Sequence, residues 1–186
     1  MLKRLIGTVL LGGGALTTGL LTAAVAVGTF ASSLFSGRVV QYRWHGRGIE
    51  RAVEAYGAAI LLFGLVLLVS AGATPATETT PHIALIVLAC IALAFSGAAD
   101  NVSSIYRNTM MQASVPDAMR GRLQGVFIVV VAGGPRVGAL YAGTLATFTA
   151  LWFPPLLGGF LVIALVAILA RRSPRFRGYD AENPEP

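Results

Sequence analysis

Five apolar stretches dominate this sequence, and short polar connections separate them. The stretches cover about residues 10–36, 54–72, 82–106, 123–148 and 151–170. A helix needs about 20 mostly apolar residues to cross a hydrocarbon core of ~30 Å. Lipid offers no partner for backbone amide and carbonyl groups, so stretches of this length form helices. The sequence therefore predicts an all-α integral membrane bundle with about five transmembrane helices.

Charged residues are too few for a soluble domain. Of the 186 residues, 12% are charged and 55% are hydrophobic, whereas about 25% are charged in an ordinary soluble protein. The net charge of +6 does not indicate nucleic-acid binding, because the arginines stand between apolar stretches rather than on a soluble surface. We therefore expect a lipid bilayer as partner and no nucleic acid.

Motifs for catalysis, cofactors or metal ions do not occur in the sequence. It has no phosphate-binding glycine loop, no nucleophile elbow and no paired-histidine metal motif. The single cysteine, Cys90, excludes an internal disulfide. We therefore expect a protein that is not an enzyme and that holds no cofactor and no metal.

The positions of the arginines predict the orientation of the helices, because Lys and Arg accumulate in cytoplasmic loops. Arginines occur after the first stretch, before the fourth and in the tail, whereas residues 72–81 and 152–155 contain no Lys or Arg. We expect a multi-pass protein of the cell membrane, with its N-terminus outside. Residues 1–170 would form the transmembrane region, and residues 171–186 a cytoplasmic tail.

Lys3 and Arg4 conflict with an N-terminus outside the cell. Residues 1–26 have the basic start, apolar centre and small residues of a signal peptide, but removal near Ala26 would leave too little of the first stretch to cross the membrane. The other explanation is that the chain is the back part of a longer protein. Both explanations stay open at this point.

Four segments, in order along the chain, carry a resemblance to a known family. They are the Gly- and Arg-containing connection at 36–48, the segment 108–127 with TMMQASVPDAMRGRLQGV, the stretch AGGPRVGALYAGTLA, and FPPLLGGFL followed by RRSPRFRGYD. Together they resemble the major facilitator superfamily, in particular its drug and siderophore branch, the enterobactin-exporter-like group. The resemblance implies that the five stretches correspond to the last five helices of a twelve-helix transporter, so the chain would be its C-terminal portion.

The resemblance also implies a function. The chain would belong to a secondary active exporter of drug-like or siderophore-like small molecules, coupled to protons. An N-terminal transporter half or self-association would supply the missing helices. The alternative, from a different class, is a non-transporting truncated membrane protein or an accessory subunit.

Two basic connections carry a candidate cytoplasmic loop motif. Pro116 ends the third helix, and Asp117 is placed to cap the next one. His45, in the first connection, is expected at the membrane interface. The motif residues are Gly37, Arg38, Gly46, Arg47, Pro116, Asp117, Arg120, Gly121 and Arg122.

Two charges fall inside predicted spans, where an ionisable side chain indicates function by default. Asp100 either lines a cavity or pairs with Arg107, although the i, i+7 spacing puts the two residues two turns apart and we expect their side chains to leave a gap. Arg136 either faces a cavity or packs inside the bundle near Pro135. Asn101 either lines the pathway or joins two helices. The candidate transport residues are Asp100, Asn101, Arg107 and Arg136.

Small residues concentrate at 28–37 and at 133–143. Such faces let helices approach closely in lipid. In a chain that holds only part of a transporter, we expect both faces to have lost their partner surface and to seek helices outside the chain.

Overall fold

The computed structural model describes residue 11 and residues 14–73, 82–114 and 117–172. These residues form helices and no strands: α2 (Gly14–Ser33), α3 (Ser36–Val40), α4 (His45–Gly72), α5 (Ile83–Ser114), α6 (Asp117–Phe148) and α7 (Phe153–Arg172). All except the short α3 are apolar enough and long enough to cross a membrane. The expected all-α membrane bundle with five spans is therefore confirmed.

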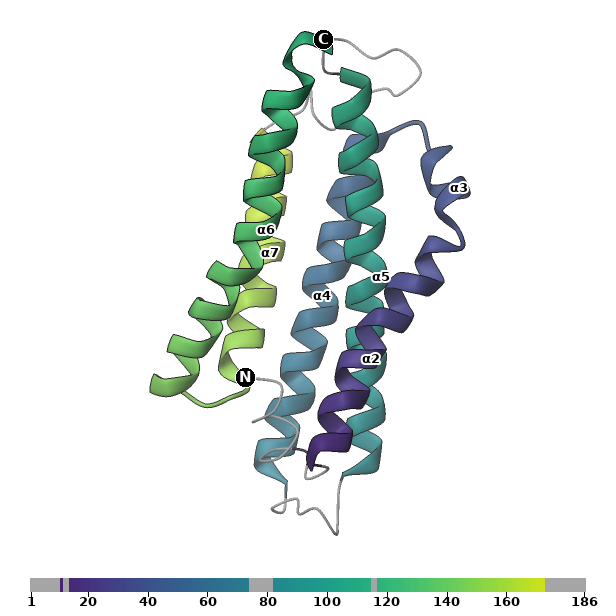
Figure 1. Cartoon of the computed structure of the whole chain (residues 1–186). Helices are drawn as coiled ribbons and strands as arrows, with labels where there is room; N and C mark the ends of the chain where they lie inside the picture. Colours follow the sequence, from purple (N-terminus) through teal and green to yellow (C-terminus); the bar gives the residue numbers. More distant parts are fainter. Residues whose placement is uncertain (1–10, 12–13, 74–81, 115–116, 173–186) are drawn as a thin grey trace.

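The order in which the long helices pack side by side differs from their order along the sequence (Figure 1). α2 packs against α5, α5 against α4, α4 against α7, and α7 against α6. The helix α5 thus lies between α2 and α4. An apolar core joins these three helices, and its buried members are Leu11, Leu21, Phe63, Val66, Leu67, Ile86, Ala89, Ala92 and Leu93.

Two glycines bring the backbones of α2 and α5 into contact. A Cβ atom added at Gly28 would overlap the carbonyl oxygen of Ala94, and one added at Gly97 would overlap that of Val25. Thr29 Oγ1 donates a hydrogen bond to the Gly97 carbonyl oxygen at 3.3 Å. The small-residue face of α2 therefore finds its partner inside the chain. The expectation that Gly28 has lost its partner surface is wrong.

A second glycine contact joins α4 to α7. A Cβ atom added at Gly159 would lie 2.8 Å from the carbonyl oxygen of Gly57 and 2.7 Å from the backbone nitrogen of Leu61. Lipid provides no hydrophobic drive for helix association, so close van der Waals contact of this kind holds the pair together. Both pairs of helices thus meet at small residues.

The helix α4 begins well before the apolar stretch that predicted it. It starts at His45 rather than near residue 54, so Gly46 and Arg47 lie in its first turn and not in a loop. Gly37 and Arg38, also expected in a loop, belong to α3. Hydropathy marks where lipid begins, whereas hydrogen bonding between backbone groups continues the helix into the polar region.

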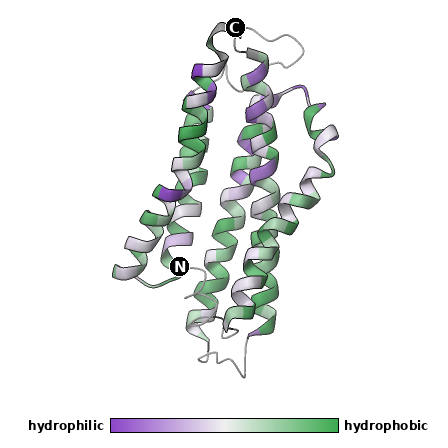
Figure 2. Cartoon of the chain, viewed as in Figure 1, coloured by the Kyte–Doolittle hydropathy of each residue, from purple (hydrophilic) through white to green (hydrophobic). Residues whose placement is uncertain are grey.

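The same lengthening affects the next two helices. α5 continues to Ser114, beyond the expected end near residue 106, and α6 begins at Asp117. Hydrophilic residues gather at this end of the bundle, which contains the start of α4, the end of α5 and the start of α6 (Figure 2). We call it the polar end.

The helix α6 is the least covered part of the bundle. None of its apolar window, Gly121–Phe148, is buried within the described residues, and its main contacts are with α7. A Cβ atom added at Gly133, Gly134, Gly138 or Gly143 would meet nothing within 4 Å. Among the described residues, this small-residue face is therefore open, and its association with helices outside the chain stays a prediction.

Candidate functional site

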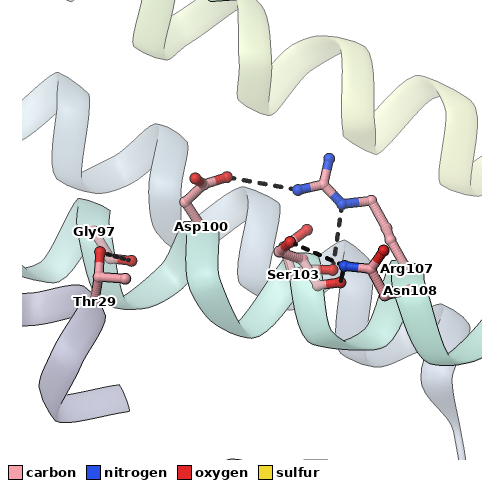
Figure 3. A network of polar contacts seen from close by, with 7 residues as sticks. Thr29, Gly97, Asp100, Ser103, Arg107 and Asn108 are labelled. Carbon is pink, nitrogen blue, oxygen red and sulfur yellow. Dashed lines mark hydrogen bonds and ion pairs between the residues drawn. The ribbon is translucent and has the colours of Figure 1, made fainter. Parts of the chain in front are cut away.

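An ion pair on α5 is the main charged feature within an apolar span (Figure 3). Arg107 Nη2 lies 3.6 Å from Asp100 Oδ1, and Arg107 Nε donates a hydrogen bond to the Ser103 carbonyl oxygen at 3.3 Å. The arginine side chain therefore runs back along its own helix. The expectation that these side chains leave a gap is wrong, because the Ser103 carbonyl, one turn before Arg107, orients the guanidinium toward Asp100.

Both members of this pair remain open to their surroundings. The Asp100 side chain is 69% exposed and that of Arg107 is 40% exposed. Asp100 lies ~26 Å along α5 from Ile83 at 1.5 Å per residue, inside a hydrocarbon core of ~30 Å. Charges at such depth are expensive against lipid and face a water-filled space or a protein partner. The pair therefore lies on an open face of α5 and not in the packed core.

Asn101, the neighbour of Asp100, points to a different helix. Its Nδ2 donates hydrogen bonds to Ser32 Oγ at 2.9 Å and Ser33 Oγ at 3.1 Å, and it lies 3.4 Å from the Thr29 carbonyl oxygen. These contacts tie α5 to the end of α2, beside the glycine contact. The sequence left open whether Asn101 lines a pathway or joins two helices, and these hydrogen bonds support the second role.

We expect Asn101→Leu to destabilise the α2–α5 contact by about 1 kcal/mol, because hydrogen bonds between membrane helices average ~0.6 and reach ~1.7 kcal/mol. The matched control is Asn108→Leu, since Asn108 Nδ2 donates to Ser104 on its own helix at 2.9 Å. Unfolding of the purified chain in detergent, followed by circular dichroism, measures the difference. Equal effects of the two substitutions would contradict the interhelical role.

Arg136 lies apart from the Asp100–Arg107 pair. It is an exposed residue of α6, which continues as a helix through Pro135. It does not pack inside the described bundle, so that alternative from the sequence is not supported. An arginine in the middle of an apolar helix requires a polar partner or water, and the described residues leave its side chain open.

The first half of the candidate loop motif is held by aromatic rings at the polar end. The Arg43 and Arg47 guanidinium carbons lie 5.4 Å and 5.2 Å from the centroid of the Trp44 ring, and that of Arg38 lies 5.9 Å from the Phe35 ring. Cation–π contacts of this kind fix the direction of otherwise mobile arginine side chains. They present a group of positive charges on one face of the polar end.

The second half of the candidate loop motif, of which the structure describes residues 117–122, lies at the start of α6 and apart from the first half. Pro116 is outside the described residues, and Asp117, Arg120, Gly121 and Arg122 occupy the first turns of α6, where Arg122 is exposed. The main contacts of α3 are with α5, whereas those of α6 are with α7. The structure therefore does not bring the two halves of the motif together as one site.

Several aromatic residues near the site carry no sequence motif. His45 is buried, with its ring centroid 5.3 Å from that of Tyr106, and its Nε2 lies 3.3 Å from the Val40 carbonyl oxygen. The expectation that His45 lies in a loop is wrong, since it is the first residue of α4, whereas its place at the membrane interface stays a prediction. Spacing within one helix could not reveal these contacts between helices.

A metal site is not formed by the part of the chain that the structure describes, since no three His, Cys, Asp or Glu residues come together there. Asp100 and Arg107 form an ion pair on an apolar helix. Their chemistry suits proton exchange, anion contact or a switch between paired and separated states.

Comparison with known proteins finds relatives along almost the whole chain. It is 29% identical to the enterobactin exporters of Escherichia coli O1:K1 and Escherichia coli O127:H6, over 90% of this chain and 44% of each relative. The chain therefore spans less than half the length of the curated relatives it matches. No protein-family model matches the chain, and no solved structure gives a significant match. The resemblance to the enterobactin-exporter-like branch of the major facilitator superfamily is confirmed, and the covered share is consistent with a C-terminal portion.

Proposed function

We propose that this chain forms the C-terminal part of a secondary active exporter that moves a drug-like or siderophore-like small molecule out of the cell. Proton-coupled alternating access drives the transport, and the substrate binds between the chain and a separate N-terminal half or a second copy. The relatives are exporters rather than enzymes, which supports transport. Their substrate, enterobactin, supports a siderophore-like solute.

The observation that carries the proposal is the exposed Asp100–Arg107 pair within an apolar helix. A membrane helix that serves only as an anchor has no reason to expose a carboxylate and a guanidinium at this depth. A carrier has such a reason, because the interface between its two halves binds solute and coupling ion. Asp100 would take up and release the proton, and Arg107 would pair with its carboxylate in the ionised state.

The orientation is part of the proposal. The arginine-rich polar end faces the cytoplasm, as does the tail from residue 171, whereas residues 72–81 face outward. Single cysteines at Thr77 and Asn183, in a Cys90→Ala background, give the check. An impermeant thiol reagent should label the first in intact cells and the second only after lysis.

The function is tested by supplying the missing helices. The chain is expressed alone and together with the N-terminal remainder of an Escherichia coli enterobactin exporter, in cells that lack their own exporter. Accumulation of ethidium and of enterobactin is measured in both. We expect lower accumulation only when the two parts are present together, and we expect a protonophore to abolish the difference.

The uncovered α6 supports a second function, that of an accessory subunit which packs against a complete transporter. The same cells distinguish the two. If the paired chains, shown by immunoblot to be in the membrane, export neither compound, and the chain co-purifies with an intact transporter, then the accessory function is correct. Export by the lone chain would instead require a working homo-oligomer.

A further inference from the structure

A groove of about 450 Å³ lies between α4 and α5 toward the polar end. Small residues form its floor, with Gly48, Ala52 and Ala55 on α4 and Ala98 and Ala99 on α5. Because none of these side chains extends beyond a methyl group, the two helices leave a furrow between them. Aromatic rings stand at its ends.

The length of the groove corresponds to one leaflet of a bilayer. Its lining runs along α5 from Phe95 to Tyr106, which is ~16 Å at 1.5 Å per residue. Half of a ~30 Å hydrocarbon core is ~15 Å. Phe95 is 67% exposed at the deep end, and Tyr42 and Tyr106, with ring centroids 6.4 Å apart, close the shallow end.

The charge of the groove is positive. Arg51 is exposed and is the one charged residue among the described residues of the lining. Glu50 and Glu54 are not among the lining residues, although Glu54, three residues after Arg51, lies on the same side of α4 as Arg51. Arg51 can extend along the helix toward the headgroup region while its methylene groups cover apolar surface.

The groove is separate from the Asp100–Arg107 pair. Asp100 is two residues from both Ala98 and Val102, which line the groove, so it lies on the other side of α5. Whatever fills the groove therefore does not compete with that pair. Lipid binding in this groove requires insertion in a membrane but not transport.

We propose that this groove binds one acyl chain of an anionic membrane phospholipid, whose phosphate is held by Arg51. The groove, of about 450 Å³, has a length that matches the part of an acyl chain within one leaflet. An acyl chain meets the apolar floor, and the phosphate forms a charge-assisted hydrogen bond with the guanidinium.

Native mass spectrometry of the purified 186-residue chain tests this binding. The chain is exchanged into detergent with phosphatidylglycerol or phosphatidylcholine of identical acyl chains. We expect one phosphatidylglycerol to be retained with about tenfold preference, equivalent to ~1.4 kcal/mol. Equal retention of the two lipids by the wild-type chain would overturn the proposal without need of any variant.

Two pairs of variants locate the lipid. Arg51→Gln should abolish the preference for phosphatidylglycerol, while Arg171→Gln, an exposed arginine at the same end, should keep it. Ala55→Phe should fill the groove and remove the retained lipid, while Ala26→Phe, at an exposed position of α2, should not. Retention at the wild-type level in both Arg51→Gln and Ala55→Phe would place the lipid elsewhere and reject this site.

Discussion

Replacing Gly28 by leucine should prevent the chain from accumulating as a folded protein in the membrane. A Cβ atom at this position overlaps the backbone of α5 at Ala94, and a backbone carbonyl cannot rotate away as a flexible side chain can. The two helices would have to separate, and Asn101 would lose its serine partners. We expect a cost above ~3 kcal/mol, at the upper end for overpacked sites, which shifts the folding equilibrium by about 100-fold.

The control for this result is Gly19→Leu on the same helix, where an added Cβ atom meets nothing within 4 Å. It makes the same change in hydrophobicity and helix propensity. Membrane abundance and a monodisperse elution profile in detergent measure both variants. Gly28→Ala should show an intermediate loss, because its single methyl group already overlaps. If Gly28→Leu and Gly19→Leu accumulate equally, α2 does not pack on α5 as described.

Neutralising Asp100 or Arg107 should abolish export by the chain paired with an N-terminal half. Either single change, Asp100→Asn or Arg107→Gln, leaves one charge of the pair without its partner on an apolar helix, which costs stability in lipid. Loss of export by a single variant could therefore come from loss of protein. The double variant removes both charges and should restore membrane abundance. We expect it still to lack export, which separates a functional role from a structural one.

The comparison uses initial efflux rates of ethidium, normalised to membrane abundance, with Arg171→Gln as the charge control. The single and double variants at the pair should fall by at least about tenfold, a change of ~1.4 kcal/mol in transition-state stabilisation. The exposed arginine at the end of α7 should leave the rate unchanged. A double-neutral variant with wild-type efflux would show that the pair only holds α5 in place.

The number of spans could be predicted because apolar length is a property of a segment taken alone. The five apolar stretches correspond to the five helices that are long enough to cross a membrane. The fourth was predicted to end at residue 148, and α6 ends at Phe148. Starts and ends at the polar side were predicted less well, since residues such as His45 and Ser114 are helical without being apolar. Backbone hydrogen bonding, rather than hydropathy, sets those boundaries.

The candidate site could be predicted only in part. Asp100 and Arg107 stood out because charge is rare in these stretches, yet their pairing depended on where the Ser103 carbonyl directs the guanidinium. The sequence could not predict that Gly28 contacts α5, because a face of small residues indicates that another helix packs there but not which helix it is. Likewise, the alanines of the α4–α5 groove appear as ordinary membrane residues until the two helices are placed side by side.

The packing of α2 against α5 implies a delay between the synthesis of α2 and the formation of its helix contact. Thr29 and Gly97, which share a hydrogen bond in the finished bundle, are 68 residues apart. At ~5–20 residues per second, the ribosome needs ~3–14 s to synthesise the residues that separate them. During that time α2 has been made without its partner, since its main contacts are with α5 and not with α4. The glycine contact of α2 therefore forms only after α5 has been synthesised.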